Sequence, residues 1–330
     1  MRILPYFYNC YLCKKIMKSI QIKKYGGSDV VEVNKTASVP SISSGKILVN
    51  VKASGVNPSD WKIREGYFQQ VAPLQFPSTL GGDFSGIVKQ IGEDDDISSD
   101  FKQGDDVYGC ASVLKDGSGA FAELALVNKD SIAYKPKSLN YVVAAGLPLV
   151  GICAWQALVE NIGLSKDQKI LIHGGAGGIG SIAIQLANHL GAYVTTTVST
   201  NDKQFVQELG ADHIIDYKKE NFEDVIHDYD AVLDTVGGET YIRSFKVLKK
   251  GGIIVSTLEQ PNSELMNQYG IRAIFQFAQV NRERLTKLAQ WVDQNNVKVN
   301  VDKTFSLDEA AKALDYQKDV HPRGKVVLTV

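Results

Sequence analysis

A chain of 330 residues is long enough for two domains, each with a hydrophobic core of its own. Its 36 lysines and arginines balance 37 aspartates and glutamates, so the charge does not indicate nucleic acid or an anionic membrane as a partner. No apolar run approaches the roughly 20 residues that span a bilayer, and we expect no membrane partner.

Four cysteines, at positions 10, 13, 110 and 153, are too few and too scattered for a disulfide scaffold. They favour a reducing compartment, and we expect a cytoplasmic protein. Residues 1–16 precede any regular pattern and are expected to form an N-terminal extension. Because no further cysteines follow at the spacing of a zinc ribbon, the sequence disfavours a metal or redox role for Cys10 and Cys13.

Residues 17–138 consist of short apolar runs between clusters of Gly, Pro, Ser and Asp, which is typical of a β-rich domain. This spacing predicts a small, partly open barrel. The acidic run at 93–96 is expected to be a solvated turn rather than a metal site. The clearest strands are expected at 19–22, 46–51, 86–91 and 106–109.

From residue 139 to about residue 294, helical and strand patterns alternate, beginning with a helix over 144–161 that is interrupted near Pro148 and Gly151. Such alternation implies right-handed crossovers, so we expect an α/β domain with a parallel, doubly wound sheet. The strand-like tail at 325–330 is expected to rejoin the first domain, which residues from about 295 onward complete. Strands of the sheet are expected at 169–173, 193–198, 213–217, 231–235, 252–256 and 271–277, with helices at 202–209, 239–249 and 282–294.

The strand at 169–173 runs into a glycine turn, and the turn opens a helix with one apolar stripe. In this context the Gly-x-Gly-x-x-Gly pattern at 175, 177 and 180 is a dinucleotide fingerprint. A pyrophosphate can reach the unpaired N–H groups of the helix N-terminus only where side chains are missing. The predicted cofactor contacts are Gly174, Gly175, Ala176, Gly177, Gly178 and Ile179.

The end of the next strand distinguishes NAD from NADP, because a carboxylate there holds the free 2′-hydroxyl and would repel a 2′-phosphate. This strand ends in Ser199 and Thr200 with no acid in place, and Lys203 follows in the first turn of the next helix. These groups predict a phosphate pocket, so we expect NADPH. Asp202 complicates this interpretation unless it caps the helix and points away.

Several strings of the sequence resemble the medium-chain dehydrogenase/reductase superfamily, and the resemblance covers residues 17–330. It implies a Rossmann dinucleotide-binding domain at 139–294 beside a GroES-like domain at 17–138. The strings that carry it are Lys18-Ser19-Ile20, Gly55-Val56-Asn57-Pro58-Ser59-Asp60-Trp61, Gly81-Gly82-Asp83-Phe84-Ser85-Gly86, Ala144-Ala145-Gly146-Leu147-Pro148, the glycine turn and Gly324-Lys325-Val326-Val327.

Many members of this superfamily are zinc alcohol dehydrogenases, whose motifs place a cysteine near the position of Asn57 and Gly-His-Glu where this chain has Gly81-Gly82-Asp83. Catalytic zinc needs three Cys, His or carboxylate ligands. The five histidines, at 173, 189, 213, 227 and 321, leave the barrel segment without any. The four-cysteine lobe that holds structural zinc is also missing, so we expect no metal.

The match is closest to the zinc-free branch of quinone oxidoreductases (zeta-crystallin-like) and enone reductases. That resemblance implies an enzyme that passes a hydride from NADPH to the β-carbon of a quinone or an α,β-unsaturated carbonyl compound, followed by protonation. It also implies a homodimer, formed by pairing of the exposed strand edge at 271–277.

For such chemistry the protein mainly positions two flat rings and polarises a carbonyl group. Asn57 is the first catalytic candidate, because its amide can donate a hydrogen bond to an enolate oxygen or hold the nicotinamide. Tyr67 matches a tyrosine near the substrate that can donate a proton or stack, although a turn-forming Asn57 and a merely packed Tyr67 remain alternatives. Asp60 is expected to be structural. The resemblance implies further cofactor contacts from Cys153, Tyr217, Val236, Ser256, Leu258, Phe275, Phe277 and Lys325.

Two other functions stay open. An enoyl-thioester reductase would need a proton-donating tyrosine, for which Tyr67 is the candidate, and a groove for a long acyl carrier. An NADPH-binding protein without turnover would act as a redox sensor or an RNA binder, although the sequence has no basic stripe for RNA.

Overall fold

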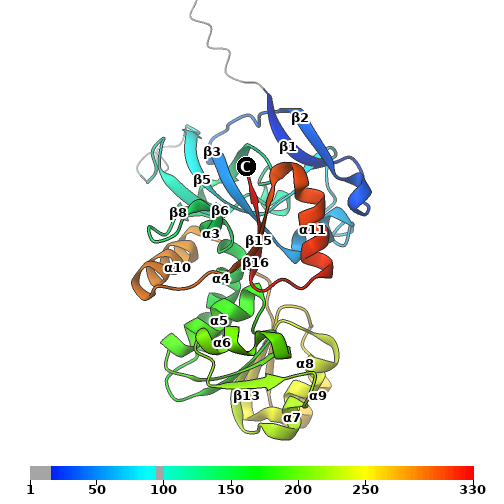
Figure 1. Ribbon diagram of the computed structural model, residues 1–330, viewed down its shortest axis with the longest axis vertical. Coiled ribbons are helices and arrows are strands. Elements are labelled where there is room, and N and C mark those ends of the chain that lie inside the picture. Colours follow the sequence, from blue (N-terminus) through cyan, green and yellow to red (C-terminus); the bar gives the residue numbers. More distant parts are fainter. Residues whose placement is uncertain (1–15, 94–99) are drawn as a thin grey trace, which may run out of the picture.

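The computed structural model describes residues 16–93 and 100–330. The expectations about Cys10, Cys13 and most of the acidic run at 93–96 lie outside these residues. Figure 1 shows two units stacked along the long axis, with the glycine-turn helix α5 (Gly178–His189) in the lower unit close to the junction. No helix in the described ranges has the length and apolar character needed to cross a bilayer.

The lower unit contains a sheet of six parallel strands. The strand order is β11-β10-β9-β12-β13-β14, which is the order of a doubly wound dinucleotide-binding sheet. The α/β fold class expected from the alternating pattern is therefore confirmed. The strands are β9 (Lys169–His173), β10 (Tyr193–Val198), β11 (His213–Asp216), β12 (Tyr229–Asp234), β13 (Leu248–Ser256) and β14 (Arg272–Phe275).

Both faces of this sheet are buried, because successive side chains of a strand point to opposite faces. On β9, Leu171 belongs to one hydrophobic cluster, while Ile170 and Ile172 belong to the other. This is why the strands are apolar throughout rather than alternating. The helices of the unit are α5, α6 (Lys203–Glu208), α7 (Phe222–Val225), α8 (Gly238–Ser244) and α9 (Ser263–Tyr269), with short 3-10 turns η5 (Thr200–Asp202) and η6 (Phe245–Val247).

The segment between the units differs from the predicted single interrupted helix. It forms α3 (Tyr141–Ala145), α4 (Pro148–Trp155) and a π-helix, η4 (Gln156–Ile162). The break falls before Pro148, as predicted, because proline is favoured in the first turn of a helix. The predicted interruption near Gly151 is wrong, since this residue lies inside α4. A Cβ atom there would lie 2.5 Å from Leu288 of α10 (Arg282–Asn295), so the glycine permits close helix packing.

The upper unit is built on two sheets, a three-stranded one in the order β2-β1-β4 and a seven-stranded one containing β15-β16-β3-β5-β6-β8, with β7 also on β3. Its last strand pairs antiparallel with β3, so the tail returns to the first part of the chain, and Figure 1 shows the red C-terminal elements beside the blue strands. The strands are β1 (Ile16–Ile22), β2 (Glu32–Ser38), β3 (Lys46–Val56), β4 (Ser78–Thr79), β5 (Asp83–Ile91), β6 (Asp106–Cys110), β7 (Leu124–Asn128), β8 (Ile132–Tyr134), β15 (Val301–Ser306) and β16 (Lys325–Thr329).

Two helices of this unit were not predicted, α1 (Pro58–Arg64) and α11 (Ala310–Asp319). Arg64, only 1% exposed, joins them, because its guanidinium group contacts Asp315 of α11 at 3.1 Å and Glu65 at 2.7 Å. The same group lies 3.4 Å from the hydroxyl of Ser28 in η1 (Ser28–Val30). Three segments far apart in the sequence are thus held by one buried cation. The remaining short turns are η2 (Val113–Lys115), η3 (Lys129–Ser131) and η7 (Leu307–Glu309).

We predict that Arg64→Ala lowers the free energy of unfolding by about 3 kcal/mol, because it removes both ion pairs and the buried aliphatic stem. Urea denaturation followed by circular dichroism measures this change. Lys24→Ala, at an exposed lysine, is the control and should change the free energy by at most about 0.5 kcal/mol. Equal stability of the two variants would contradict a structural role for Arg64.

Candidate active site

The glycine turn connects β9 to α5 at the carboxyl edge of the parallel sheet. Gly174 has a φ of +72°, which favours glycine. A Cβ atom on Gly175 would lie 2.0 Å from Oγ1 of Thr196, and one on Gly180 would lie 2.3 Å from the carbonyl oxygen of Gly174. By contrast, a Cβ on Gly177, the N-cap of α5, would meet only a carbonyl oxygen at 3.3 Å. Gly175 and Gly180 therefore permit close packing, whereas Gly177 keeps the N-terminus of α5 free of side chains. A helix N-terminus of this kind fits a pyrophosphate.

The predicted phosphate pocket lies at the end of β10, and the structure brings its three residues together. Ser199 donates a hydrogen bond to Asp202 at 2.7 Å, and Thr200 donates one to the buried Asp216 at 2.6 Å. The Lys203 ammonium lies 3.8 Å from the same Asp216 carboxylate. The hydroxyl and ammonium groups expected to bind the phosphate therefore lie together. In this structure they contact the carboxylates of Asp202 and Asp216.

Asp202, the residue that complicated the interpretation of this pocket, is neutralised from the other unit. Arg323, two residues before β16, contacts its carboxylate at 2.7 Å and the carbonyl oxygen of Asn201 at 3.1 Å. An ion pair of this kind removes much of the repulsion that a phosphate would meet. Tyr217, predicted to contact the cofactor, follows β11 and is exposed beside this pocket's Asp216.

A buried polar cluster lies where β3 meets α1. The Asn57 amide donates from Nδ2 to Asp83 at 2.9 Å, and its Oδ1 accepts a hydrogen bond from the Lys325 ammonium. Lys325 also donates to the carbonyl oxygen of Val56 at 2.8 Å, while the backbone N–H of Asn57 donates to Asp60 at 2.8 Å. Both ends of the amide are engaged, so its orientation is fixed and one N–H of Nδ2 remains.

Two carboxyl groups and one ammonium group share this buried cluster, and all three are at most 4% exposed. Burial raises the pKa of Asp60 to about 7, and the neighbouring Asp83 carboxylate adds to the rise. Burial also raises the pKa of Asp83 and lowers that of Lys325, whereas the attraction between these two groups opposes both changes. The cluster therefore favours one shared negative charge beside Lys325, with Asp60 largely protonated at acidic pH.

Lys325 connects this cluster to the glycine turn. The backbone N–H of Gly324 donates to the carbonyl oxygen of Ala176 at 2.8 Å. A Cβ atom on Gly178 would lie 3.1 Å from Cδ of Lys325, so the lysine side chain runs past the start of α5. The sequence identified Lys325 as a cofactor contact, and the structure brings it between the turn and Asn57.

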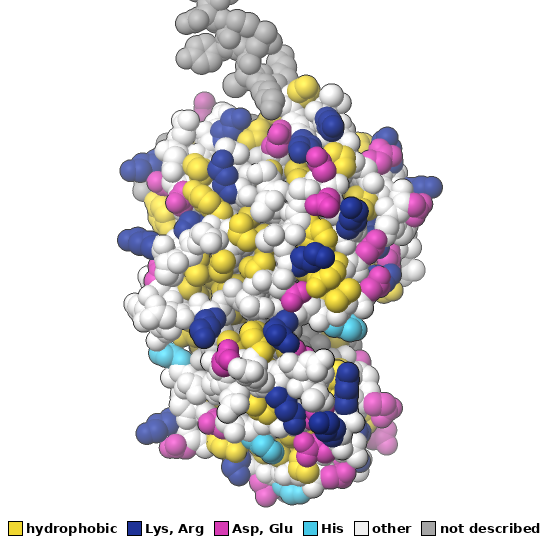
Figure 2. Space-filling model, in the orientation of Figure 1, with side chains coloured by type: hydrophobic (Ala, Val, Ile, Leu, Met, Phe, Trp, Pro, Cys, Tyr) yellow, Lys and Arg dark blue, Asp and Glu magenta, His cyan; other side chains and the backbone are white. Residues whose placement is uncertain are grey.

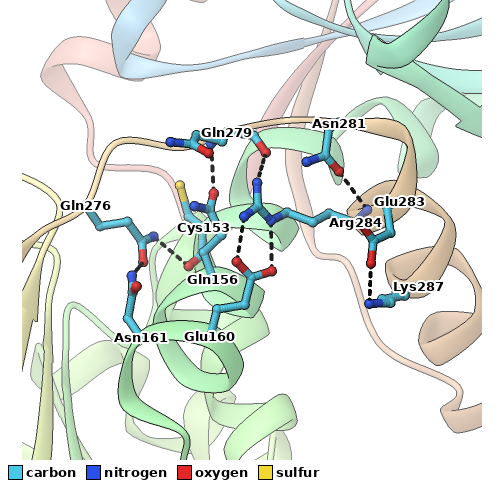
Figure 3. Close-up of polar contacts among 10 residues, drawn as sticks. All are labelled: Cys153, Gln156, Glu160, Asn161, Gln276, Gln279, Asn281, Glu283, Arg284 and Lys287. Atoms are coloured by element: carbon cyan, nitrogen blue, oxygen red, sulfur yellow. Dashed lines mark hydrogen bonds and ion pairs between the residues drawn. The ribbon is translucent and has the colours of Figure 1, made fainter.

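Cys153, another predicted cofactor contact, lies in α4 and is buried. Burial raises the pKa of its thiol to about 12, with the Asp83 carboxylate adding to the rise, so the group is a neutral thiol and not a nucleophile. Figure 3 shows Gln276 reaching from the segment after β14 to the carbonyl oxygen of Cys153, at 2.9 Å, while Asn161 donates to Gln276 at 2.8 Å.

Other predicted cofactor contacts follow the carboxyl ends of the central strands. Ser256 is fully buried and its hydroxyl donates to Asp234 at 2.7 Å, so this hydroxyl is engaged within the protein. Exposed apolar side chains at a strand edge are typical of a ligand crevice. The exposed apolar side chains that follow β12, β13 and β14 are Val236, Leu258 and Phe277, respectively. Phe275, at the end of β14, is half-buried.

Tyr67 lies in the turn after α1 and is 65% exposed. Its ring stacks edge-on against Trp61 with 5.7 Å between the centroids. It is not part of the buried cluster around Asn57, and its role in catalysis stays a prediction.

Asp83 is the functional candidate that sequence reasoning did not identify. It appeared only as part of Gly81-Gly82-Asp83, the string that departs from a zinc motif. Its carboxylate stands at the start of an otherwise apolar strand. Because a buried charge requires a partner, this position could have indicated a buried polar contact. Within residues 16–93 and 100–330, no three or more His, Cys, Asp or Glu side chains are grouped so that they could hold a metal ion.

Comparison with known proteins agrees with this geometry. The family profile "Alcohol dehydrogenase GroES-like domain" matches residues 43–137, which confirms the predicted GroES-like part of the fold. The profile "Zinc-binding dehydrogenase" matches residues 209–328.

Relatives match nearly the whole chain. The 2-methylene-furan-3-one reductase of Solanum lycopersicum is 36% identical over 94% of this chain and 79% of its own length. The chloroplastic NADPH-dependent alkenal/one oxidoreductase of Arabidopsis thaliana is 36% identical over 95% of this chain and 80% of its own. The solved structure of the quinone oxidoreductase from Coxiella burnetii is 34% identical, with a TM-score of 0.87 over 95% of this chain and 99% of that one. The chain therefore belongs to the medium-chain dehydrogenase/reductase superfamily, in its branch of quinone oxidoreductases and alkenal/one reductases.

Proposed function

We propose that this protein is a zinc-independent, NADPH-dependent reductase of quinones or α,β-unsaturated carbonyl compounds. One observation carries the proposal, namely that the strand holding Gly324 and Lys325 joins the glycine turn to the buried Asn57 amide. Phosphate-binding and ring-binding groups then share one crevice at the carboxyl edge of the sheet. The names of the relatives, an alkenal/one oxidoreductase and a quinone oxidoreductase, support the same chemistry.

NADPH would supply the hydride, and the residues of the chain would bind and orient it. The bare N-terminus of α5 would receive the pyrophosphate, and Ser199, Thr200 and Lys203 would turn from their carboxylates toward the 2′-phosphate. Asn57 and Lys325 would lie beside the nicotinamide, with Asn57 fixed by Asp83. The Arabidopsis relative, whose name states NADPH dependence, supports this choice of cofactor.

Zinc independence rests on the side chains of the candidate site. Asn57 donates a hydrogen bond to Asp83 and accepts one from Lys325, so an ammonium group lies beside this pair. A cation there would be repelled by Lys325. The carbonyl group of the substrate would then be polarised by hydrogen-bond donors rather than by a metal ion.

A homodimer is part of the proposal. Strand β14 forms one edge of the six-stranded sheet, and an unpaired strand edge is a surface on which a second copy can pair. We place the protein in the cytoplasm, where Cys110 and Cys153 would stay reduced; both are free and buried. On the face in Figure 2, acidic and basic side chains are interspersed, which gives no support to an RNA-binding role.

The activity is tested by mixing the purified protein with NADPH and a panel of quinones, alkenals and enones. We expect the absorbance band of NADPH to decay with at least one acceptor class, at the same rate after treatment with a zinc chelator. Tight NADPH binding without decay for any acceptor would favour the sensor alternative. Loss of activity with the chelator would contradict zinc independence.

Lys203→Ala should raise the KM for NADPH about tenfold, because it removes a charged contact to the 2′-phosphate. NADH lacks this phosphate, so its KM should not change. Steady-state kinetics with both cofactors measures the difference. Lys246→Ala, at an exposed lysine after α8, is the control, and an equal effect of Lys203→Ala on both cofactors would remove Lys203 from the phosphate pocket.

Tyr67→Phe distinguishes the reductase proposal from the enoyl-thioester alternative. An exposed hydroxyl is a weak candidate for an obligatory acid, so we expect kcat to fall by less than about fivefold with an enone. Removal of an obligatory general acid would instead lower kcat by about 100-fold or more. The pH dependence of kcat, measured for wild type and for Tyr67→Phe, checks whether Tyr67 acts as a general acid.

A further inference from the structure

Lys115 extends from the upper unit across the crevice to the lower one. It ends the short turn η2, and its ammonium group donates a hydrogen bond to the carbonyl oxygen of Ala278 at 2.8 Å. Ala278 follows Phe277, and the same ammonium lies 5.8 Å from the centroid of that exposed ring. A cation thus lies next to an apolar side chain predicted to line the cofactor crevice.

Both ends of this contact are held in place. On the lower side, Figure 3 shows the segment that carries Ala278 tied to η4 by two groups of contacts. The backbone N–H of Gln279 donates to Gln156 at 2.7 Å. Arg284 donates to the carbonyl oxygen of Gln279 at 2.9 Å and forms a two-pronged ion pair with Glu160, at 2.8 and 2.6 Å. The carbonyl that receives Lys115 is therefore rigidly placed.

On the upper side, the turn that carries Lys115 is equally fixed. Asn128 donates to the backbone carbonyl oxygen of Lys115 at 3.0 Å. The turn closes through a hydrogen bond from the N–H of Gly117 to Ser112 at 3.0 Å, and a Cβ atom on Gly117 would lie 2.2 Å from the carbonyl oxygen of Ala111. Fixing both ends limits the positions open to the ammonium group, as an oxyanion-binding donor requires.

Lys115 differs from Lys325 in its counter-charges. No ion pair among residues 16–93 and 100–330 includes it, whereas the buried Lys325 has Asp83 and Asp60 as counter-charges. An ammonium group has three N–H donors, and the Ala278 carbonyl takes one of them. Two N–H donors of Lys115 are therefore not used by the Ala278 carbonyl oxygen.

This charge acts on the candidate site. Burial raises the pKa of the Cys153 and Cys110 thiols to about 12, and in both cases the Lys115 ammonium opposes the rise. It also opposes the burial-driven rise in the pKa of Asp83. The field of Lys115 therefore reaches Cys153 and Asp83 in the candidate site.

We propose that Lys115 binds the carbonyl oxygen of the substrate and stabilises the negative charge that develops on it. The inference rests on the proposed reductase function. A hydride brings two electrons to the β-carbon of an enone, and the electron pair of the C=C bond shifts so that the carbonyl oxygen becomes an enolate oxygen. The α-carbon then takes a proton from water, which restores the carbonyl group and releases Lys115. Lys115 supplies this donor in addition to the one N–H of the Asn57 amide that remains.

Lys115→Met tests this role, because it removes the charge and the N–H donors and keeps an unbranched side chain only one atom shorter. We expect kcat/KM for the enone to fall about 30-fold, with most of the loss in kcat. The dissociation constant of NADPH, measured by fluorescence, should stay within about twofold of wild type. Lys115→Arg should recover part of the loss. Lys287→Met, at an exposed lysine paired with Glu283 on α10, is the matched control and should behave as wild type.

A binding measurement separates this inference from the proposed function. The phenolate form of para-nitrophenol resembles an enolate, and its absorbance distinguishes it from the neutral phenol. Wild type with NADP⁺ should bind the phenolate about 30-fold more tightly than Lys115→Met does. If wild type reduces no acceptor, the reductase function fails, and this titration still decides whether Lys115 holds an oxyanion.

Three results would overturn the role of Lys115. Turnover and phenolate binding could both remain within about twofold of wild type in Lys115→Met. Wild type could fail to bind the phenolate. Finally, NADPH affinity could fall as much as kcat/KM, in which case Lys115 would only tie the two units together.

Discussion

The pairing of the C-terminal strand with the long strand β3 is the constraint on which the candidate site depends. It brings Gly324 against Ala176 in the glycine turn and inserts Lys325 beside Asn57. Glycine is required there, since φ is +82° and a Cβ would lie 2.4 Å from the carbonyl oxygen of Asn300. The lysine costs free energy to bury, and the carboxyl groups of Asp83 and Asp60 offset this cost, so charge as well as strand pairing fixes β16 in the upper unit.

Carboxylates and cations are distributed along the crevice in a regular way. At the phosphate end, Asp202 and Asp216 are matched by Arg323 and Lys203. At the ring end, the buried acids are matched by Lys325. A basic side chain therefore accompanies the acids at each end of the site.

The fold could be predicted because its signals are local. Helix and strand periods alternate over short windows, and the glycine turn carries its function in seven consecutive residues. The contacts of Arg64 with Asp315 and of Lys115 with Ala278 join residues 251 and 163 positions apart, and no local pattern encodes them. Helix α1 was missed because its seven residues begin within a turn-like Asn57-Pro58 pair. Gly151 was misread because packing against Leu288 outweighed its low helix propensity.

The π-helix η4 has a consequence for how this crevice can change during evolution. Its wide turn directs Gln156, Glu160 and Asn161 toward the segment that carries Phe277 and Ala278. A π-helical turn holds one more residue than an α-helical one, and each residue turns an α-helix by about 100°. Losing a single residue from this stretch would narrow the turn and rotate Glu160 and Asn161 away from Arg284 and Gln276. The shape of the crevice wall is therefore sensitive to chain length at this point, where an insertion or deletion would change specificity more than a substitution would.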